Sequence, residues 1–179
     1  MKEHLYFIAI LPNREISSEV TQFKEYAAEH FDSSRALRSP SHITLFPPFR
    51  WPGNEEAALE KSMRAFVREA SGFFLELENF DCFAPRVIFV DIVPNPELIR
   101  LQKQLEHWLQ RTLNLQSKDD RPYHPHMTVA FKDLKKGVFP DAWAHFSKIK
   151  YHRIFSVQEI ALLKHEDHAW KIRRIFSFV

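Results

Sequence analysis

The sequence predicts a fold that mixes strands and helices in two similar halves. Apolar runs of strand length alternate with amphipathic helical segments, and the order of these elements occurs twice. Each half also contains one copy of the motif His-x-Thr-aliphatic, spelled HITL at 42–45 and HMTV at 126–129. An internal duplication explains two matching orders better than coincidence does.

The first half begins with a buried strand and a helix whose apolar residues recur at helical spacing after Asn13, a possible cap. A second strand carries the first motif, and the proline-rich segment after it is expected to break regular structure. A further helix and a strand of alternating burial complete this half. In order, the predicted ranges are strand 4–11, helix 14–31, strand 41–46, irregular 47–54, helix 55–70 and strand 73–80.

The second half repeats this order, and the spacing from Val87 to His126 nearly equals that from Leu5 to His42. We therefore expect a single domain over 1–179 with pseudo-repeats at about 1–81 and 82–179. Its predicted elements are strand 86–93, a helix from Pro96 to about Leu113, strand 124–131, a short helix near 140–147 and a strand pair at 153–163 and 168–178.

Composition excludes several classes of protein. The three glycines cannot build a glycine-rich phosphate loop, and the single cysteine, Cys82, cannot form an intrachain disulfide. A formal net charge of +2 is lower than that of a dedicated duplex-DNA binder. The N-terminal apolar run LYFIAIL is too short to span a membrane. We expect a monomeric, soluble protein of the cytoplasm that does not bind a membrane.

The two motifs carry residues suited to phosphate-ester chemistry. In a strand, residues i and i+2 share a face, so His42 lies with Thr44 and His126 with Thr128. Two imidazoles can act as one base and one acid near neutral pH, and two hydroxyls can donate hydrogen bonds to phosphate oxygens. This scheme requires no metal and no cofactor.

At these residues the chain resembles the 2H phosphoesterase family, named for two His-x-Thr motifs, and its branch of 2′-5′ RNA ligase-like proteins or RNA 2′,3′-cyclic phosphodiesterases. The resemblance covers nearly the whole chain, including the helix after the first strand and the segments 87–109, 121–131 and 155–167. It departs at Phe131, where many relatives have arginine nearby, and at the proline-rich FPPFRWPG (46–53).

The resemblance implies a bilobal α+β fold of the LigT-like type, with two antiparallel-rich sheets lining a central cleft and helices outside. It implies a metal-independent hydrolase that opens 2′,3′-cyclic phosphodiesters, or reversibly joins 2′-5′ linkages, at RNA ends or small cyclic nucleotides. By motif position, His42 and His126 are the catalytic pair and Thr44 and Thr128 bind the phosphate. Which histidine is the acid is left open.

Four further residues are candidates for substrate binding. Phe46 falls on the face of His42 by alternation, so it can stack on a base or ribose, or it is an ordinary packed residue. Tyr123 can stack or donate a hydrogen bond. Arg121 can contact phosphate or belong to a solvated loop, and His124 shares the parity of His126.

Two alternatives remain at this point. A non-catalytic RNA-end binding protein would keep the same cleft without turnover, although it has no need for both imidazoles. A metal hydrolase is also conceivable, because His124 and His126 form a His-x-His pair to which His42 can add a third ligand. That scheme lacks a matching carboxylate near either motif and leaves both threonines unexplained.

Overall fold

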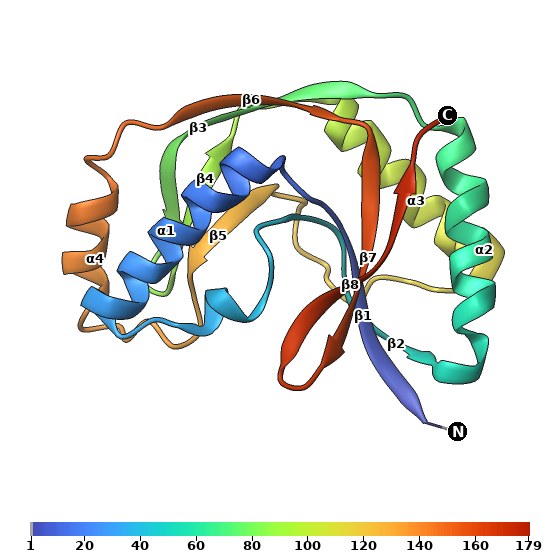
Figure 1. Ribbon diagram of the computed structural model, residues 1–179, viewed down its shortest axis with the longest axis horizontal. Coiled ribbons are helices and arrows are strands. Elements are labelled where there is room, and N and C mark those ends of the chain that lie inside the picture. The colour runs from blue at the N-terminus through green and yellow to red at the C-terminus, as the bar shows by residue number, and fades with distance from the viewer. Residues whose placement is uncertain (1) are drawn as a thin grey trace.

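The structure is a computed structural model that describes residues 2–179, and it contains two antiparallel sheets of four strands each. The strands are β1 (Glu3–Ile10), β2 (Ile43–Pro52), β3 (Phe73–Phe83), β4 (Val87–Ile92), β5 (His126–Ala130), β6 (His152–Val157), β7 (Glu159–Glu166) and β8 (Ala169–Ser177). Sheet A has the order β2-β1-β7-β8, and sheet B has the order β5-β4-β3-β6 (Figure 1). The α+β class and the two antiparallel sheets are confirmed.

The helices begin and end where local chemistry favours it. They are α1 (Arg14–Phe31), α2 (Glu56–Phe66), α3 (Pro96–Leu113) and α4 (Phe139–Phe146). The side chains of Asn13 and Asn95 each accept a hydrogen bond of 2.9 Å from the third backbone N–H that follows, which caps α1 and α3. Asp32 and Asn114 end the same two helices in the left-handed conformation.

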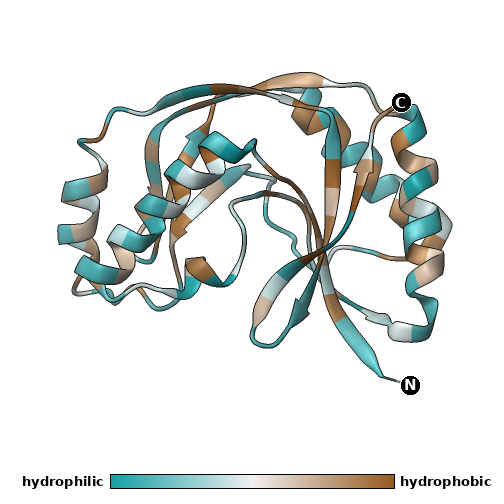
Figure 2. Ribbon diagram, viewed as in Figure 1, coloured by the Kyte–Doolittle hydropathy of each residue, from teal (hydrophilic) through white to brown (hydrophobic). Residues whose placement is uncertain are grey.

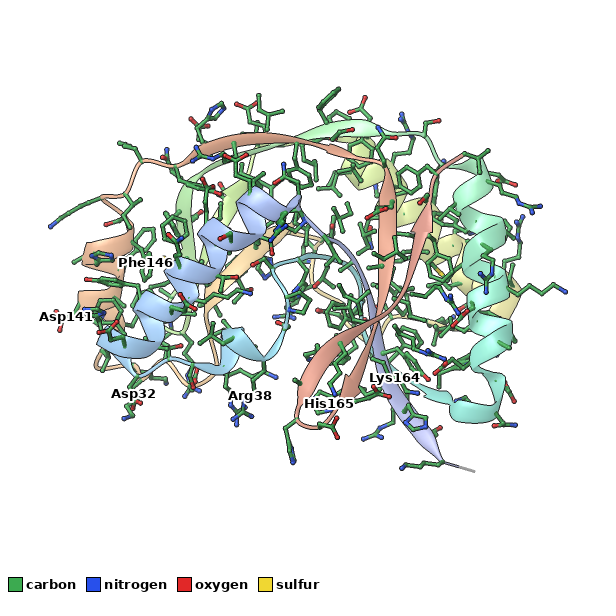
Figure 3. All side chains as sticks on the ribbon, in the orientation of Figure 1. Asp32, Arg38, Asp141, Phe146, Lys164 and His165 are labelled. Atoms are coloured by element: carbon green, nitrogen blue, oxygen red, sulfur yellow. The ribbon has the colours of Figure 1, made fainter. Side chains whose placement is uncertain are left out.

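The two longest helices cross from one sheet to the other. Helix α1 connects β1 to β2 of sheet A, yet it packs against β5 of sheet B; α3 connects β4 to β5 of sheet B, yet it contacts β2 (Figure 1). The ring of Phe23 on α1 lies 5.1 Å from that of Phe80 on β3. Figure 3 shows Phe146 of α4 on the side of α1. Each sheet is therefore covered by a helix that, along the chain, lies between two strands of the other sheet.

Sheet A has two different faces. Tyr6, Ile8 and Ile10 belong to the main hydrophobic core, whereas Phe7 and Ala9 point to the opposite side. That opposite side, here called the inner face of sheet A, carries a small separate cluster completed by Ala161, Leu163, Leu11 and Trp170. Figure 2 shows apolar residues along the central strands and polar ones on the exposed sides of the helices.

Two predicted boundaries are wrong. Strand β2 continues through the proline-rich segment to Pro52, because β2 is an edge strand and Pro47 and Pro48 lie where its register with β1 shifts. The predicted strand 153–163 is two strands, since the chain passes from sheet B to sheet A at Gln158, between β6 and β7.

The order strand, helix, strand occurs in β1-α1-β2 and again in β4-α3-β5. The pseudo-repeats at about 1–81 and 82–179 stay a prediction. No helix within residues 2–179 combines the length and apolar character needed to cross a bilayer.

Candidate active site

The two motif segments show the alternation that the sequence predicts. Ile43 and Leu45 after His42 are buried in the core, and so are Met127 and Val129 after His126. The two histidines and the two threonines are only partly buried, on the side away from the core. The aliphatic residues therefore anchor each segment, while the polar residues face outward.

The same backbone device orients both imidazoles. Nδ1 of His42 lies 2.7 Å from the carbonyl oxygen of Pro40, and Nδ1 of His126 lies 2.7 Å from that of His124. Because a carbonyl only accepts hydrogen bonds, each Nδ1 carries the proton and donates it. The neutral rings therefore hold Nε2 unprotonated, as a proton acceptor.

Aromatic side chains pack against each imidazole. The centroid of the Phe7 ring lies 4.7 Å from that of His42. The rings of Phe89 and Phe83 lie 5.1 Å and 5.2 Å from that of His126. These contacts fix the ring planes and remove water from one side of each histidine, so both side chains are held rigidly.

The fold brings the two motif segments together. Strands β2 and β5 are the edges of their sheets and contact each other. The hydroxyl of Tyr123 donates a hydrogen bond of 2.9 Å to the backbone carbonyl of Thr44, which ties the two segments across the lobes. The charge of protonated His126 lowers the pKa of His42, so the two rings interact electrostatically. The two motif segments, each with its histidine, thus lie next to each other.

Both threonine hydroxyls are available to a ligand. Thr44 pairs with Ala9 of β1, and Thr128 pairs with Phe89 of β4. Within residues 2–179, neither hydroxyl forms a hydrogen bond to another protein group. Each can therefore donate to an anionic oxygen without losing a partner.

The surroundings of His42 favour the neutral form of its imidazole. Burial lowers its pKa to about 4, the Pro40 carbonyl opposes this shift, and the charge of Lys24 adds to it. Lys24 of α1 is only 3% exposed, and its Nζ donates a hydrogen bond of 3.1 Å to the backbone carbonyl of Ser39. Burial lowers the pKa of Lys24 to about 8, so at neutral pH it remains a cation. Its charge repels a proton from His42.

The surroundings of His126 are different. Burial again lowers the pKa, and the charges of His124 and Arg121 act in the same direction. Asp91 acts in the opposite direction, because its carboxylate favours the protonated ring. Asp91 pairs with His126 across β4 and β5, and its Oδ1 lies 4.0 Å from Nε2 of His124. The carboxylate of Asp91 therefore acts on His126, whereas the buried cation of Lys24 acts on His42.

The stacking role predicted for Phe46 is wrong. Its side chain is 1% exposed and belongs to the hydrophobic core. The cause is a register shift: Ala9 pairs with Thr44 but the next residue back, Ile8, pairs with Phe46, so strict alternation fails after Thr44. Phe46 therefore points to the opposite face from Thr44.

The other three candidates lie near the second motif. The hydroxyl of Tyr123 donates its hydrogen bond to the backbone carbonyl of Thr44, so this residue links the two motif segments. Arg121 is paired with Asp119 at 2.6 Å and its side chain is 86% exposed, yet its charge reaches His126. The ring of His124 packs edge-on against Phe83 at 5.0 Å. Their contact with a substrate stays a prediction.

The His-x-His pair is less compact than a metal site needs. The ring centroids of His124 and His126 are 6.4 Å apart. The part of the chain that the structure describes contains no group of three or more His, Cys, Asp or Glu side chains arranged to hold a metal ion.

Comparisons with known proteins agree with the motifs. The family model of the 2′-5′ RNA ligase superfamily matches residues 12–169. The chain belongs to this superfamily. Its resemblance to 2H phosphoesterases, predicted from the two motifs, is thereby confirmed.

Two relatives of the chain in this superfamily are named RNA 2′,3′-cyclic phosphodiesterase. The protein of Bacillus subtilis strain 168 is 29% identical over 143 residues, which are 76% of this chain and 75% of the relative. That of Geobacillus stearothermophilus is 28% identical over 171 residues, 92% of this chain and 53% of the relative. The crystal structure of E. coli LigT complexed with 3′-AMP is similar with a TM-score of 0.69 at 18% identity, covering 99% of both chains. This likeness shows the LigT-like fold.

Sequence reasoning missed Lys24 and Asp91, although each leaves a signal. Lys24 falls on the apolar stripe of α1, four residues after Val20 and three before Ala27. A charge buried at such a position destabilises the fold unless it is paired. Asp91 is a lone acid within the apolar run VIFVDIV (87–93). In both cases the signal is a charged residue at a position where the surrounding pattern predicts an apolar one.

Proposed function

We propose that the chain is a phosphodiesterase that opens 2′,3′-cyclic phosphodiesters at RNA or nucleotide ends by two-histidine acid–base catalysis. The observation that carries this proposal is the matched pair of imidazoles. Both are held by an Nδ1–H···O=C hydrogen bond of 2.7 Å, and both belong to segments tied together by Tyr123. The names of the Bacillus and Geobacillus relatives support the same reaction.

In this reaction a water oxygen attacks the phosphorus of the cyclic ester. Nε2 of one neutral histidine accepts the water proton as the new P–O bond forms. The bond from phosphorus to one ribose oxygen breaks, and that oxygen takes a proton from Nε2 of the other, protonated histidine. The product is a phosphomonoester, and the two histidines have exchanged protonation states. The same sequence of steps, with a 5′-hydroxyl in place of water as the nucleophile and the ribose 3′-oxygen as the leaving group, joins a 2′-5′ linkage.

The surroundings favour His42 as the base and His126 as the acid in hydrolysis. Burial and the charge of Lys24 keep His42 neutral. Asp91 raises the proton affinity of His126, and a bound phosphate anion raises it further. The opposite assignment would place the proton beside Lys24, where it is least stable.

Thr44 and Thr128 complete the site by donating hydrogen bonds to the two non-bridging phosphate oxygens. Negative charge grows on these oxygens during the attack, so donors aimed at them stabilise the transition state more than the ground state. Two oxygens and two hydroxyls on matching segments give each oxygen its own donor.

The test is hydrolysis of a nucleoside 2′,3′-cyclic phosphate, measured with and without EDTA. We expect chelator-insensitive turnover, and a loss of about 10²–10⁴-fold in kcat for either His42→Ala or His126→Ala. The matched control is His107→Ala, which removes an exposed histidine of α3. Abolition by EDTA would instead indicate a metal hydrolase. Binding of RNA ends without product would indicate the non-catalytic alternative.

A further inference from the structure

A cavity of about 520 Å³ lies between helix α1 and the inner face of sheet A. Its size is within the range of small-molecule binding sites, about 300–1,000 Å³. The residues that line it come from four parts of the chain: the end of β1, the exposed side of α1, the two residues before His42, and β8. They include Leu11, Arg14, Glu25, Pro40, Ser41 and Ile172.

The cavity adjoins His42. Pro40 and Ser41, which line it, directly precede this histidine, and the Pro40 carbonyl accepts the hydrogen bond from its Nδ1. On the far side, Ile172 of β8 pairs with Leu163 of β7. Leu163 belongs to the same inner-face cluster as Phe7, whose ring contacts His42. A molecule whose phosphate lies at the two histidines can therefore extend directly into the cavity.

The walls of the cavity differ in chemistry. One wall is apolar, formed by Leu11, Pro40 and Ile172, and Ile172 leaves 48% of its surface exposed. The opposite wall is a row of hydroxyls and an amide on α1, at positions 17, 18, 21 and 22. Between the walls lies Ser41, which is 2% exposed and whose buried hydroxyl has no hydrogen-bond partner among the described residues. A nucleoside has the same division, with a flat apolar base and a hydroxylated sugar.

The two ends of the cavity along α1 carry opposite charges. Arg14 lies at the first turn, where the helix N-terminus adds positive partial charge, and it makes no salt bridge within residues 2–179. Glu25 lies at the other end, three turns away, or about 16 Å at 1.5 Å per residue. An anionic chain is attracted near Arg14 and repelled near Glu25, so the cavity suits one added nucleotide, and any further nucleotides would lie outside it.

We propose that this cavity binds the nucleotide next to the one that carries the cyclic phosphate. The preferred substrate is then an RNA end of at least two nucleotides, with the linking phosphodiester near Arg14, the base against Ile172 and the sugar against the hydroxyls of α1. This inference rests on the proposed function, because it takes the reacting phosphate to lie between His42 and His126.

The first test compares the 2′,3′-cyclic phosphates of a mononucleotide, a dinucleotide and a trinucleotide. We expect kcat/KM to rise about tenfold from one nucleotide to two, the effect of one well-placed charged contact, and to change little from two to three. In Arg14→Ala the ratio of dinucleotide to mononucleotide kcat/KM falls toward one, whereas the matched control Arg68→Ala, an exposed arginine far from the cavity, keeps it. An unchanged ratio in Arg14→Ala overturns the subsite.

The second test does not depend on turnover. A dinucleotide ending in a 3′-phosphate is titrated against the wild type, Arg14→Ala and Ile172→Ser, and the Kd is compared with that of a mononucleoside 3′-phosphate. We expect each variant to weaken dinucleotide binding several-fold more than mononucleotide binding. If no cyclic phosphate is hydrolysed but this difference holds, the subsite stands and the proposed reaction fails. If hydrolysis occurs and both ligands bind equally in every protein, the reaction stands and the subsite fails.

Discussion

The two His-x-Thr segments are alike in backbone geometry and unlike in electrostatic surroundings. Each histidine donates from Nδ1 to the carbonyl two residues earlier, at 2.7 Å in both cases. Behind His42, however, lies the buried cation Lys24, whereas His126 faces the carboxylate of Asp91. The motif therefore fixes the position and tautomer of each ring, and residues outside the motif fix its proton affinity.

This difference assigns separate tasks to two copies of the same motif. A base must be neutral, so it works above its own pKa; an acid must be protonated, so it works below its own pKa. The pKa of His42 is about 4, and that of His126 lies below the ordinary histidine value. The profile of kcat/KM against pH is accordingly expected to be a bell whose maximum lies on the acid side of neutrality.

The largest effect tests what the two segments share. Thr44→Val and Thr128→Val each remove one hydroxyl donor without changing side-chain size, and each is expected to lower kcat by about 10², the typical effect of losing one donor to a developing oxyanion. The measurement is steady-state hydrolysis of a nucleoside 2′,3′-cyclic phosphate. The control is Thr112→Val on α3. A full loss in one variant and none in the other would show that the phosphate does not sit symmetrically between the segments.

The next effect acts on His42 alone. Lys24→Met removes the nearby cation, so the pKa of His42 rises and the rising limb of the bell moves from about pH 4 to higher pH. The same change stabilises the fold at neutral pH. Keeping Lys24 charged with a pKa of about 8 costs about 3 kcal/mol of folding free energy relative to an ordinary lysine. The variant also loses the hydrogen bond to Ser39, which reduces its gain in stability by about 1 kcal/mol.

Thermal unfolding and a pH–rate profile on the same variant decide this prediction. The cost of the buried charge is fully present below pH 8 and disappears as pH rises toward the ordinary pKa of lysine, so the stability advantage of Lys24→Met shrinks in alkaline buffer. A less stable protein with an unmoved rising limb would mean that Lys24 has only a structural role. Lys24→Arg, which keeps the charge, is the matched comparison.

The smallest effect acts on His126 alone. Asp91→Asn removes the carboxylate that favours the protonated ring, so the pKa of His126 falls further and activity is lost at lower pH on the falling limb. We expect a smaller shift than in Lys24→Met, because Asp91 is partly exposed and its charge is screened. The control is Asp141→Asn on α4, and a displaced rising limb would exchange the roles assigned to the two histidines.

Much of the fold was predictable because its elements have strong local signals. Asn13 as the possible cap of α1, and the apolar stripe that follows Pro96 in α3, locate two helices almost to the residue. The alternation of Ile43 and Leu45 with Thr44 likewise follows from strand geometry alone. The catalytic candidates were therefore visible from the motifs without any tertiary contact.

The errors all depend on contacts between distant segments. Phe46 turns into the core because the pairing of β2 with β1 slips by one residue, and Pro47 and Pro48 are tolerated because β2 is an edge strand. Neither fact can be deduced from residues 41–52 by themselves. The pairing of Lys24 with Ser39 and of Asp91 with His126 is also tertiary, so only an out-of-pattern charge hinted at it.

The exchange of α1 and α3 between the lobes determines how the molecule holds together. If the lobes separated, the apolar side of α1, including Ile16 and Val20, would leave sheet B, and α3 would leave β2. Swinging the halves apart would thus expose core surface, as unfolding does. The distance between the two imidazoles is consequently set by the packed interior, and a polypeptide cut in the β3–β4 turn would yield two pieces that each hold an incomplete share of both sheets.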